Sequence, residues 1–349
     1  MRIVTIDCGT TNSRVYVVDE KGFVYGKASR KVGVRDTAIS GSRHELQVGL
    51  KLTLEEAINS AGVQLDDIDF IISSGMITSE LGLKELPHLW APVSIDTLAK
   101  SIERVEDPEV FPQDIPVYFV RGIKNKYDPS HVDFIDVGKL DFMRGEEAQI
   151  AGIVSLGIAE PPFTVAMLSS HTKYISVDSS GRIMGSVTTL SGQIFDALLS
   201  NSFIGKSIQS DPKVSATEGI DQQVLDSAFE WVQKTGLLRS LLMTRFLDVL
   251  METEWYQRRL FVEGCIAAED IKALTQFKPL GLEINTPYVL IGKHARCAIY
   301  KDLISRKTEV NHDIQIISEE SLMDSLSIHG ALLLGKKAGL IKKESDRYV

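Results

Sequence analysis

The sequence has 349 residues, of which 44% are hydrophobic and 24% charged, and its formal net charge is −9 at pH 7. This length is more than one ordinary hydrophobic core uses, so two domains of roughly 100–200 residues each are expected. The acidic balance argues against a broad nucleic-acid or anionic-membrane surface, because phosphate groups attract clustered lysines and arginines. A local basic pocket for one small anion is compatible with it.

The first residues predict a strand rather than a targeting segment. They lack the long apolar stretch and the small-residue cleavage site of a secretion signal. No stretch of the chain approaches the roughly 18 apolar residues of a membrane-spanning helix. Cys8, Cys265 and Cys297 lie far apart, which indicates neither a disulfide framework nor a zinc site. The cytoplasm is therefore the expected location.

The first third of the chain predicts a β-meander followed by a helix and a buried strand. Short runs of β-branched and aromatic residues predict strands at 3–6, 14–18 and 23–28. Leucines three or four residues apart predict a helix over 43–61, which ends at Gly62. Residues 69–73 form a compact apolar strand before Ser74-Gly75-Met76.

A proline-containing stretch from Pro87 to Pro116 interrupts these patterns and favours a domain border at residue 115. The opening order then recurs: strands at 164–168, 174–177 and 183–188 are separated by a polar turn and a glycine turn. The rest is largely helical, with strands at 288–291 and 314–317. We therefore expect an α/β protein with domains at 1–115 and 116–349, whose last helix, over 319–339, packs back on the first domain.

The segment 7–14 reads Asp-Cys-Gly-Thr-Thr-Asn-Ser-Arg. Asp7 ends a buried strand, where a carboxylate needs a cation or strong donors. Gly9, Thr10, Thr11 and Asn12 can fold tightly and present N–H and hydroxyl groups to phosphate oxygens. Asp7 would then hold Mg²⁺, largely through water. The simpler interpretation is an ordinary hairpin with Asp7 as a turn former.

The segment 141–147 reads Asp-Phe-Met-Arg-Gly-Glu-Glu. Glu146 and Glu147 can open a helix, where the N-terminal dipole favours negative charge. Either glutamate is a candidate general base for a hydroxyl, and Arg144 is a candidate clamp for a carboxylate or phosphate. Taken alone, the segment is more typical of a charged helix cap.

The segment 168–174, Leu-Ser-Ser-His-Thr-Lys-Tyr, is predicted to form the turn of the second repeat. Its hydroxyls, amides and lysine suit the outer phosphates of a nucleotide, although a lone histidine in a turn is more often structural. Gly292, at the end of a strand, would let adenine approach the backbone. Neither a Walker loop nor a Rossmann fingerprint is present. The predicted phosphate contacts in this half are Ser170, His171, Thr172, Lys173 and Gly292.

Together these segments resemble the family of 2-dehydro-3-deoxygalactonokinases, over most of the chain. Residues 7–14 match the opening Asp-x-Gly-(Ser/Thr)-Thr-Asn-x-Arg, and residues 75–79 are similar to its Gly-Met segment. The most specific match is Met-Arg-Gly-Glu-Glu-Ala-Gln at 143–149, where the family has Thr in place of Ala. His171 and Lys173 fall in the Pro-Gly-Thr-His-x-Lys-Trp block, and residues 191–193 in its Thr-Gly-Glu block.

The sequence also departs from this family. Ser169 and Ser170 replace the family's Pro-Gly, and its Thr is replaced in register, so the second phosphate loop lacks the family's glycine. Tyr174 replaces Trp, Gln193 replaces Glu, and Cys8 replaces an aromatic residue. A Glu-to-Gln change removes a charge and any role as a base. These departures keep two alternatives open: a non-catalytic sensor of nucleotide or sugar acid, and a kinase for another sugar acid.

The resemblance implies two ribonuclease H-like, actin-like ATPase domains with an interdomain cleft that binds ATP. It implies phosphoryl transfer from Mg²⁺·ATP to a hydroxyl of a small sugar acid, in which Arg14, Met76 and Arg144 contact the substrate. Asp7 would hold the metal, and Glu146 or Glu147 would accept the proton. The expected partners are ATP and the sugar acid, with no nucleic acid and no membrane, and a homo-oligomer is compatible with the sequence.

Overall fold

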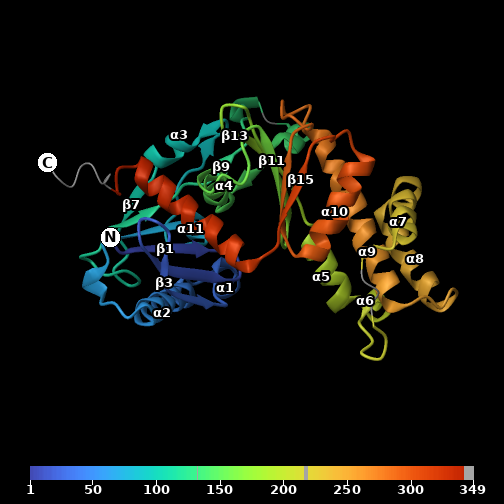
Figure 1. Cartoon of the computed structure of the whole chain (residues 1–349), viewed down its shortest axis with the longest axis horizontal. Helices are drawn as coiled ribbons and strands as arrows, with labels where there is room; N and C mark the ends of the chain where they lie inside the picture. The colour runs from blue at the N-terminus through green and yellow to red at the C-terminus, as the bar shows by residue number, and fades with distance from the viewer. Residues whose placement is uncertain (132, 216–218, 342–349) are drawn as a thin grey trace. The chain divides into compact units, whose positions relative to one another are not determined.

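The computed structural model describes residues 1–131, 133–215 and 219–341 (Figure 1). The chain divides into two compact units. Unit 1 comprises Met1–Pro161, Val177–Gly185 and Glu319–Val349, and unit 2 comprises Pro162–Ser176 and Ser186–Ser318. Residues 116–161 group with unit 1, so the predicted border at residue 115 does not coincide with this division.

The chain enters unit 1 with a meander of three strands, as its β-branched runs predict. The elements of unit 1 are β1 (Ile3–Cys8), β2 (Ser13–Val18), β3 (Val24–Arg30), α1 (Val34–Ser40), α2 (His44–Ala61), β4 (Phe70–Gly75), β5 (Leu89–Trp90), β6 (Val93–Ser94), α3 (Ile95–Lys100), β7 (Glu103–Val105), β8 (Val117–Phe119), β9 (Ile123–Lys124), β10 (Phe142–Met143), α4 (Glu146–Ser155) and α11 (Glu320–Lys337). Short 3₁₀ turns lie at Leu65–Asp67, Met76–Thr78, Pro129–His131 and Phe134–Lys139.

The large sheet of unit 1 has the order β3-β2-β1-β4-β8-β7. β1, β4 and β8 are parallel, whereas β2 pairs antiparallel with both β1 and β3. A small sheet, β10-β9-β5, stands beside it in the same unit. Since parallel strands need a crossover, α2 connects β3 to β4 and covers one face of the large sheet (Figure 1).

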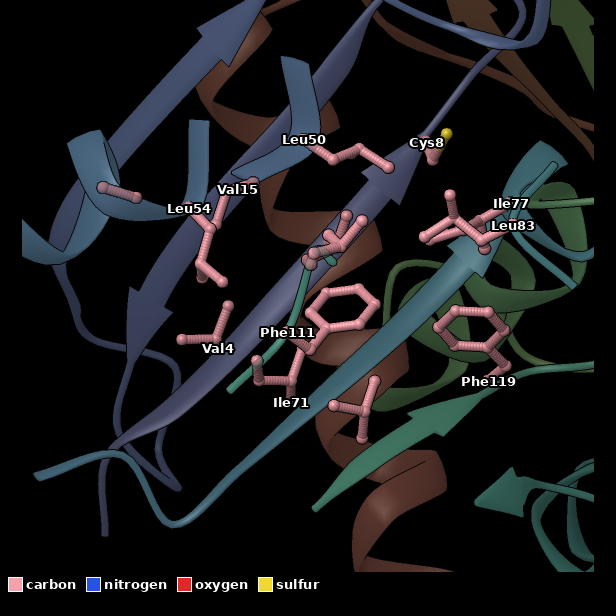
Figure 2. Packing of buried hydrophobic residues seen from close by; sticks show 14 of the residues in the cluster. Val4, Cys8, Val15, Leu50, Leu54, Ile71, Ile77, Leu83, Phe111 and Phe119 are labelled. Atoms are coloured by element: carbon pink, nitrogen blue, oxygen red, sulfur yellow. The ribbon is translucent and has the colours of Figure 1, made fainter. Parts of the chain in front are cut away.

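The main core of unit 1 lies between this sheet and α2. Figure 2 shows Val4 and Cys8 of β1 beside Leu50 and Leu54 of α2, with Ile71 of β4 close by. All of these side chains are almost completely buried. Because side chains alternate along a strand, Thr5 and Asp7 point to the other face of the sheet, against which α11 packs. The alternation therefore directs Asp7 away from the apolar core.

Unit 2 repeats the strand order of unit 1. Its elements are β11 (Phe163–Leu168), β12 (Thr172–Val177), β13 (Arg182–Thr189), α5 (Ser191–Asn201), α6 (Phe203–Ile208), α7 (Gln222–Thr235), α8 (Leu237–Val249), α9 (Trp255–Asp270), a 3₁₀ turn (Ile271–Gln276), β14 (Tyr288–Gly292), α10 (His294–Lys307) and β15 (Ile314–Ile317).

The second large sheet has the order β15-β14-β11-β12-β13-β6, and the order β15-β14-β11-β12-β13 corresponds to β8-β4-β1-β2-β3. β11, β14 and β15 are parallel, as are β1, β4 and β8. β13 begins in unit 1, where Arg182 and Ile183 pair with Ser94 and Val93 of β6. The repeat predicted from the two strand–turn patterns is therefore present in the fold.

Helices α4 and α11 pack together in unit 1 through two glycines. A Cβ atom at Gly330 would overlap the carbonyl oxygen of Ala148, and one at Gly152 would overlap that of Leu326. This approach fixes the position of α4, the helix that begins with Glu146 and Glu147.

Gly330→Ala should therefore destabilise the protein by about 1–3 kcal/mol, because an added methyl group must separate the two helices. Gly335→Ala on the same helix is the matched control. Its Cβ would meet Ile341 at 3.6 Å, an ordinary contact, so the change should be neutral or stabilise by up to about 1 kcal/mol. Urea unfolding of both variants measures the difference, and equal effects would contradict this packing.

Candidate functional site

Asp7 lies near the end of β1, in the middle of the unit 1 sheet. It is opposite Arg14 on β2 and Ser74 on β4, and its Oδ2 atom is 3.4 Å from Nη1 of Arg14. Burial raises the pKa of Asp7, the negative charges of Glu146 and Asp324 raise it further, and Arg14 opposes them. Around this carboxyl group, two acidic side chains face one arginine, and a bound cation would stabilise its ionised form.

The loop that follows β1 is tight and held by its own backbone. The N–H of Gly9 donates to the carbonyl of Asn12 at 2.8 Å, and the N–H of Arg35 donates to the carbonyl of Thr10 at 2.9 Å. A Cβ atom at Gly33 would overlap this same part of the loop. The side chains of Thr10 and Asn12 are exposed, and Thr11 is half-buried. The loop thus leaves these polar side chains accessible to a ligand.

Two glycines bring three segments of unit 1 together beside Asp7. Gly75 pairs with Cys8 and has φ of +93°, and a Cβ atom there would overlap the Cys8 carbonyl oxygen and lie 3.5 Å from Oδ1 of Asp7. Gly145 has φ of +107°, and its Cβ would lie 3.2 Å from Cα of Gly75. Asp7, the half-buried Met76 and the start of α4 therefore meet where β1 and β4 end.

The two glutamates at the start of α4 have different surroundings. Glu147 is completely buried, and both of its carboxylate oxygens accept from the N–H of Gly145, at 2.9 and 2.8 Å. Burial, together with the charge of Glu146, raises the pKa of Glu147 to about 8. Glu146 is half-buried, and its Oε2 accepts from the N–H of Arg144 at 3.0 Å. Of these two candidate bases, Glu146 is the one with access to solvent.

Arg144 is half-buried and bonded to the segment that follows β4. Its Nη1 donates to Oγ1 of Thr78 at 2.6 Å, and its Nη2 donates to the carbonyl of Leu86 at 2.9 Å. Burial lowers the pKa of this guanidinium, and the nearby Arg121 lowers it further. Arg121, which the sequence analysis does not single out, is thus a second cation in this neighbourhood.

The raised pKa of Glu147 predicts a pH dependence of stability. Between its ordinary value of 4.5 and about 8, the folded state holds a proton that the unfolded state has released. Stability therefore falls as the pH rises through this range, by up to about 1.4 kcal/mol per pH unit. Glu147→Gln should remove this part of the slope in urea unfolding at pH 5, 6.5 and 8.

Glu55→Gln, an exposed position on α2, should leave the slope unchanged. A Glu147→Gln slope equal to that of the unaltered protein would contradict the raised pKa.

In unit 2 the turn between β11 and β12 is shorter than predicted. It consists of residues 169–171, while Thr172 and Lys173 already belong to β12 and are buried. Oγ of Ser170 lies 3.2 Å from Nδ1 of His171, and Nζ of Lys173 donates to Oγ1 of Thr188 at 2.7 Å. The shorter turn follows from partners inside the unit, which allow the polar side chains of Thr172 and Lys173 to be buried.

A pocket of about 350 Å³ lies beside this turn, within unit 2. Ser169 and Ser170 of the turn line it, together with Lys293 and Arg296, which follow β14. Gly292 comes immediately before Lys293. A Cβ atom at Gly292 would lie only 2.6 Å from the carbonyl oxygen of Leu168, so β14 and β11 approach closely at this point. The other lining residues are Leu168, Ser191, Gly192, Phe195, Asp196, Arg259, Glu263, Ile266, Ala295, Ile299 and Tyr300.

The predicted site residues thus form two groups, one in each unit. Those of segments 7–14, 76 and 144–147 lie in unit 1, and those of segment 170–173 and Gly292 lie in unit 2. The sequence analysis missed the basic side chains of the pocket. Lys293 and Arg296 are three residues apart and directly follow the strand that ends in Gly292, and this pattern could have pointed to a basic site.

Residues 7–324 match the 2-keto-3-deoxy-galactonokinase family. The chain belongs to this family. Among its relatives, the 2-dehydro-3-deoxygalactonokinase of Escherichia coli strain K12 is 22% identical over 278 residues, which cover 79% of this chain and 81% of that protein. Family membership confirms the resemblance predicted from segments 7–14 and 143–149, and makes the chain a sugar-acid kinase, a phosphotransferase.

Two solved structures share the fold. A Sinorhizobium meliloti protein assigned by its name to the 2-dehydro-3-deoxygalactonokinases has a TM-score of 0.70 and 18% identity, covering 96% of this chain and 98% of its own. The activator of 2-hydroxyisocaproyl-CoA dehydratase from Clostridium difficile, solved with bound ADPNP, has a TM-score of 0.50 and 14% identity, covering 100% and 98%. The predicted α/β fold of the actin-like ATPase and sugar-kinase type is thereby confirmed.

Two further results concern only residues 1–131, 133–215 and 219–341. In this part of the chain, no helix combines the length and the apolar character that crossing a membrane requires. Within the same residues, no three histidine, cysteine, aspartate or glutamate side chains are grouped so that they could hold a metal ion. Asp7 could contribute a single carboxylate ligand to a metal ion.

Proposed function

We propose that this kinase transfers the γ-phosphoryl group of ATP to a hydroxyl of 2-dehydro-3-deoxygalactonate or a close relative. The observation that carries the proposal is the meeting of Asp7, Gly75 and Gly145, which joins the two segments most similar to the family at one end of the unit 1 sheet. The E. coli relative bears the name of this activity. Phosphoryl transfer depends mainly on positioning and charge neutralisation, which such a rigid arrangement of backbone and acid can provide.

The pocket of unit 2 is the proposed nucleotide site. Its apolar side chains, Phe195, Ile266 and Ile299, suit a base, and Lys293 suits a phosphate. Gly292 permits close approach to the backbone, and Ser170 and His171 are the proposed phosphate contacts of the turn. Thr172 and Lys173, which the sequence predicts as further contacts, are buried in β12 and would instead support the turn. The C. difficile activator, which shares the fold, was solved with bound ADPNP. This supports ATP as the nucleotide.

Asp7 is the proposed magnesium ligand. One carboxylate fits Mg²⁺, which keeps several waters and takes its other ligands from substrate phosphates. The raised pKa of Asp7, in a surplus of negative charge, also fits a cation. Bound Mg²⁺ would neutralise charge on the phosphates, while Thr10, Thr11 and Asn12 would donate to phosphate oxygens. Gly9, whose N–H donates to the carbonyl of Asn12, would hold the loop in shape around the phosphates.

Glu146 is the proposed general base. The acceptor hydroxyl oxygen would form a bond to the γ-phosphorus, the bond from that phosphorus to the departing ADP oxygen would break, and the hydroxyl proton would pass to the Glu146 carboxylate. Glu147, bonded to the N–H of Gly145, would hold the turn that positions Glu146. Arg14, Met76 and Arg144 are the proposed contacts of the sugar acid, with Arg144 near its carboxylate.

We also propose the cytoplasm as its location and small molecules as its partners. The net charge of −9 does not favour nucleic acid or anionic lipid. Cys8, Cys265 and Cys297 are buried free thiols, as is usual in a reducing compartment. Self-association into a homo-oligomer is compatible with this proposal.

A coupled assay of ADP release, run over a panel of aldonates and 2-keto-3-deoxy sugar acids, tests the reaction. Turnover is expected to be highest with 2-dehydro-3-deoxygalactonate. Measurable ATP binding without turnover on any acid would instead favour a non-catalytic sensor of nucleotide or sugar acid. This is the main alternative, because Ser169, Ser170 and Gln193 stand in the segments where the family has a glycine and a glutamate.

Asp7→Asn should lower kcat by about 100-fold or more, because the phosphates lose the metal that neutralises them. Asp66→Asn, an exposed aspartate without a hydrogen bond to its side chain among the described residues, is the control and should leave kcat unchanged. Intact turnover in Asp7→Asn would refute the assignment of the metal ligand.

A further inference from the structure

A network of buried hydroxyl groups connects Arg296 to Asp270 inside unit 2. Arg296 donates through Nη1 to the carbonyl of Ser169, at 2.5 Å, and through Nη2 to the hydroxyls of Thr172 and Ser191, at 3.1 and 2.7 Å. One guanidinium therefore holds the residue that opens the turn after β11, the residue that follows the turn, and the first residue of α5.

The other end of the network is the carboxylate of Asp270, the last residue of α9. Its Oδ2 accepts from the hydroxyl of Tyr300 at 2.5 Å, and its Oδ1 accepts from the hydroxyl of Thr189. The Tyr300 oxygen lies 3.5 Å from Oγ1 of Thr172, and the Thr189 oxygen lies 3.5 Å from Oγ of Ser191. Two routes of hydroxyl groups thus join the carboxylate to the guanidinium.

Burial makes this network costly unless it is complete. Asp270 is 4% exposed, and Thr172, Ser191 and Tyr300 are equally well buried. Among the residues that the structure describes, no lysine or arginine nitrogen lies within 4.0 Å of the Asp270 carboxylate. The hydroxyl groups of Tyr300 and Thr189 are therefore the donors that satisfy its two oxygens, and a buried carboxylate that lost them would be strongly destabilising.

The donor chemistry gives the network one direction. A guanidinium can only donate and an ionised carboxylate can only accept, so the hydroxyls between them are ordered by both ends. Asp270 does not line the 350 Å³ pocket, whereas Ser169, Ser191 and Arg296 do. Tyr300, which donates to Asp270, also lines the pocket, so the network connects Asp270 to a ligand there.

We propose that Asp270 and Arg296 are positioning residues that hold the turn at Ser169, Ser170 and His171 in the conformation that receives nucleotide phosphates. This inference rests on the proposed function, which places the nucleotide in the unit 2 pocket. It assigns to the network a contribution to phosphate binding rather than to binding of the nucleoside.

Comparison of ATP with adenosine separates this role from a general structural one. Asp270→Asn removes the carboxylate and places an NH₂ group, which is a donor, against the hydroxyl of Tyr300 or Thr189, which is also a donor. One hydrogen bond of the network is then lost, and the turn at residues 169–171 is held less firmly. The dissociation constant for Mg²⁺·ATP should rise about tenfold, while that for adenosine should change by less than about twofold. Both constants are measured by calorimetric titration of the full-length protein.

Glu269→Gln is the matched control, because Glu269 precedes Asp270 on the same helix and pairs instead with Lys272, at 2.9 Å. Both constants should be unchanged. Thr189→Val supplies a second variant, should Asp270→Asn fail to fold. It removes one route at nearly constant volume, and ATP binding should weaken by about threefold without an effect on adenosine.

Equal losses of ATP and adenosine binding, or no loss of either, would overturn the positioning role. In that case turnover by the unaltered enzyme would leave the proposed function standing. Failure of the unaltered protein to bind Mg²⁺·ATP would instead refute the proposed function, and this inference with it.

Discussion

The site in unit 1 depends on a backbone contact that only glycine permits. Gly75 lies so close to the carbonyl of Cys8 that a Cβ atom would overlap it, and a Cβ atom at Gly145 would make a tight contact of 3.2 Å with Cα of Gly75. Both also have positive φ values, which side chains disfavour. Because of this contact, the end of β1, the end of β4 and the start of α4 share one small space, and Asp7, Met76 and Glu146 become neighbours.

The rest of unit 1 supports this contact. The pair Gly152 and Gly330 lets α4 lie directly against α11, and α11 in turn covers the face of the sheet to which Asp7 points. Glu147 fixes the N–H of Gly145 from within the protein. Burial first, and then the charges of Glu146 and Asp324, raise the pKa of Asp7, while Arg14 lowers it.

The two units have the same strand order but carry different residues at the end of the central strand. At the end of β1, unit 1 presents a carboxylate and a tight glycine loop, whereas at the end of β11 unit 2 presents two serines, the first of which accepts a hydrogen bond from Arg296 through its carbonyl. The corresponding glycine, Gly292 on β14, again allows close packing against the central strand. In both units the connection after the central strand carries polar groups, and the glycine on the neighbouring strand makes room for them.

Much of this could be predicted from the sequence, because the signals are local. The alternation of β-branched residues predicts the meander, and the segments 7–14 and 143–149 predict the family. The network from Arg296 to Asp270 could not be predicted, because residues in contact within it are up to 128 positions apart and only the fold brings them together. The same holds for Thr172 and Lys173, whose polar character suggests an exposed turn, although hydroxyl partners within unit 2 allow them to be buried in β12.

Asp7 is a partly buried acid that we propose binds a cation, and its titration can be measured by following its side-chain carboxyl carbon by NMR as a function of pH. In the free protein its pKa should lie above the ordinary value of 3.8, and Mg²⁺ with a non-hydrolysable ATP analogue should lower it markedly. A pKa at or below 3.8 in the free protein, or one that does not respond to the metal and nucleotide, would contradict the account.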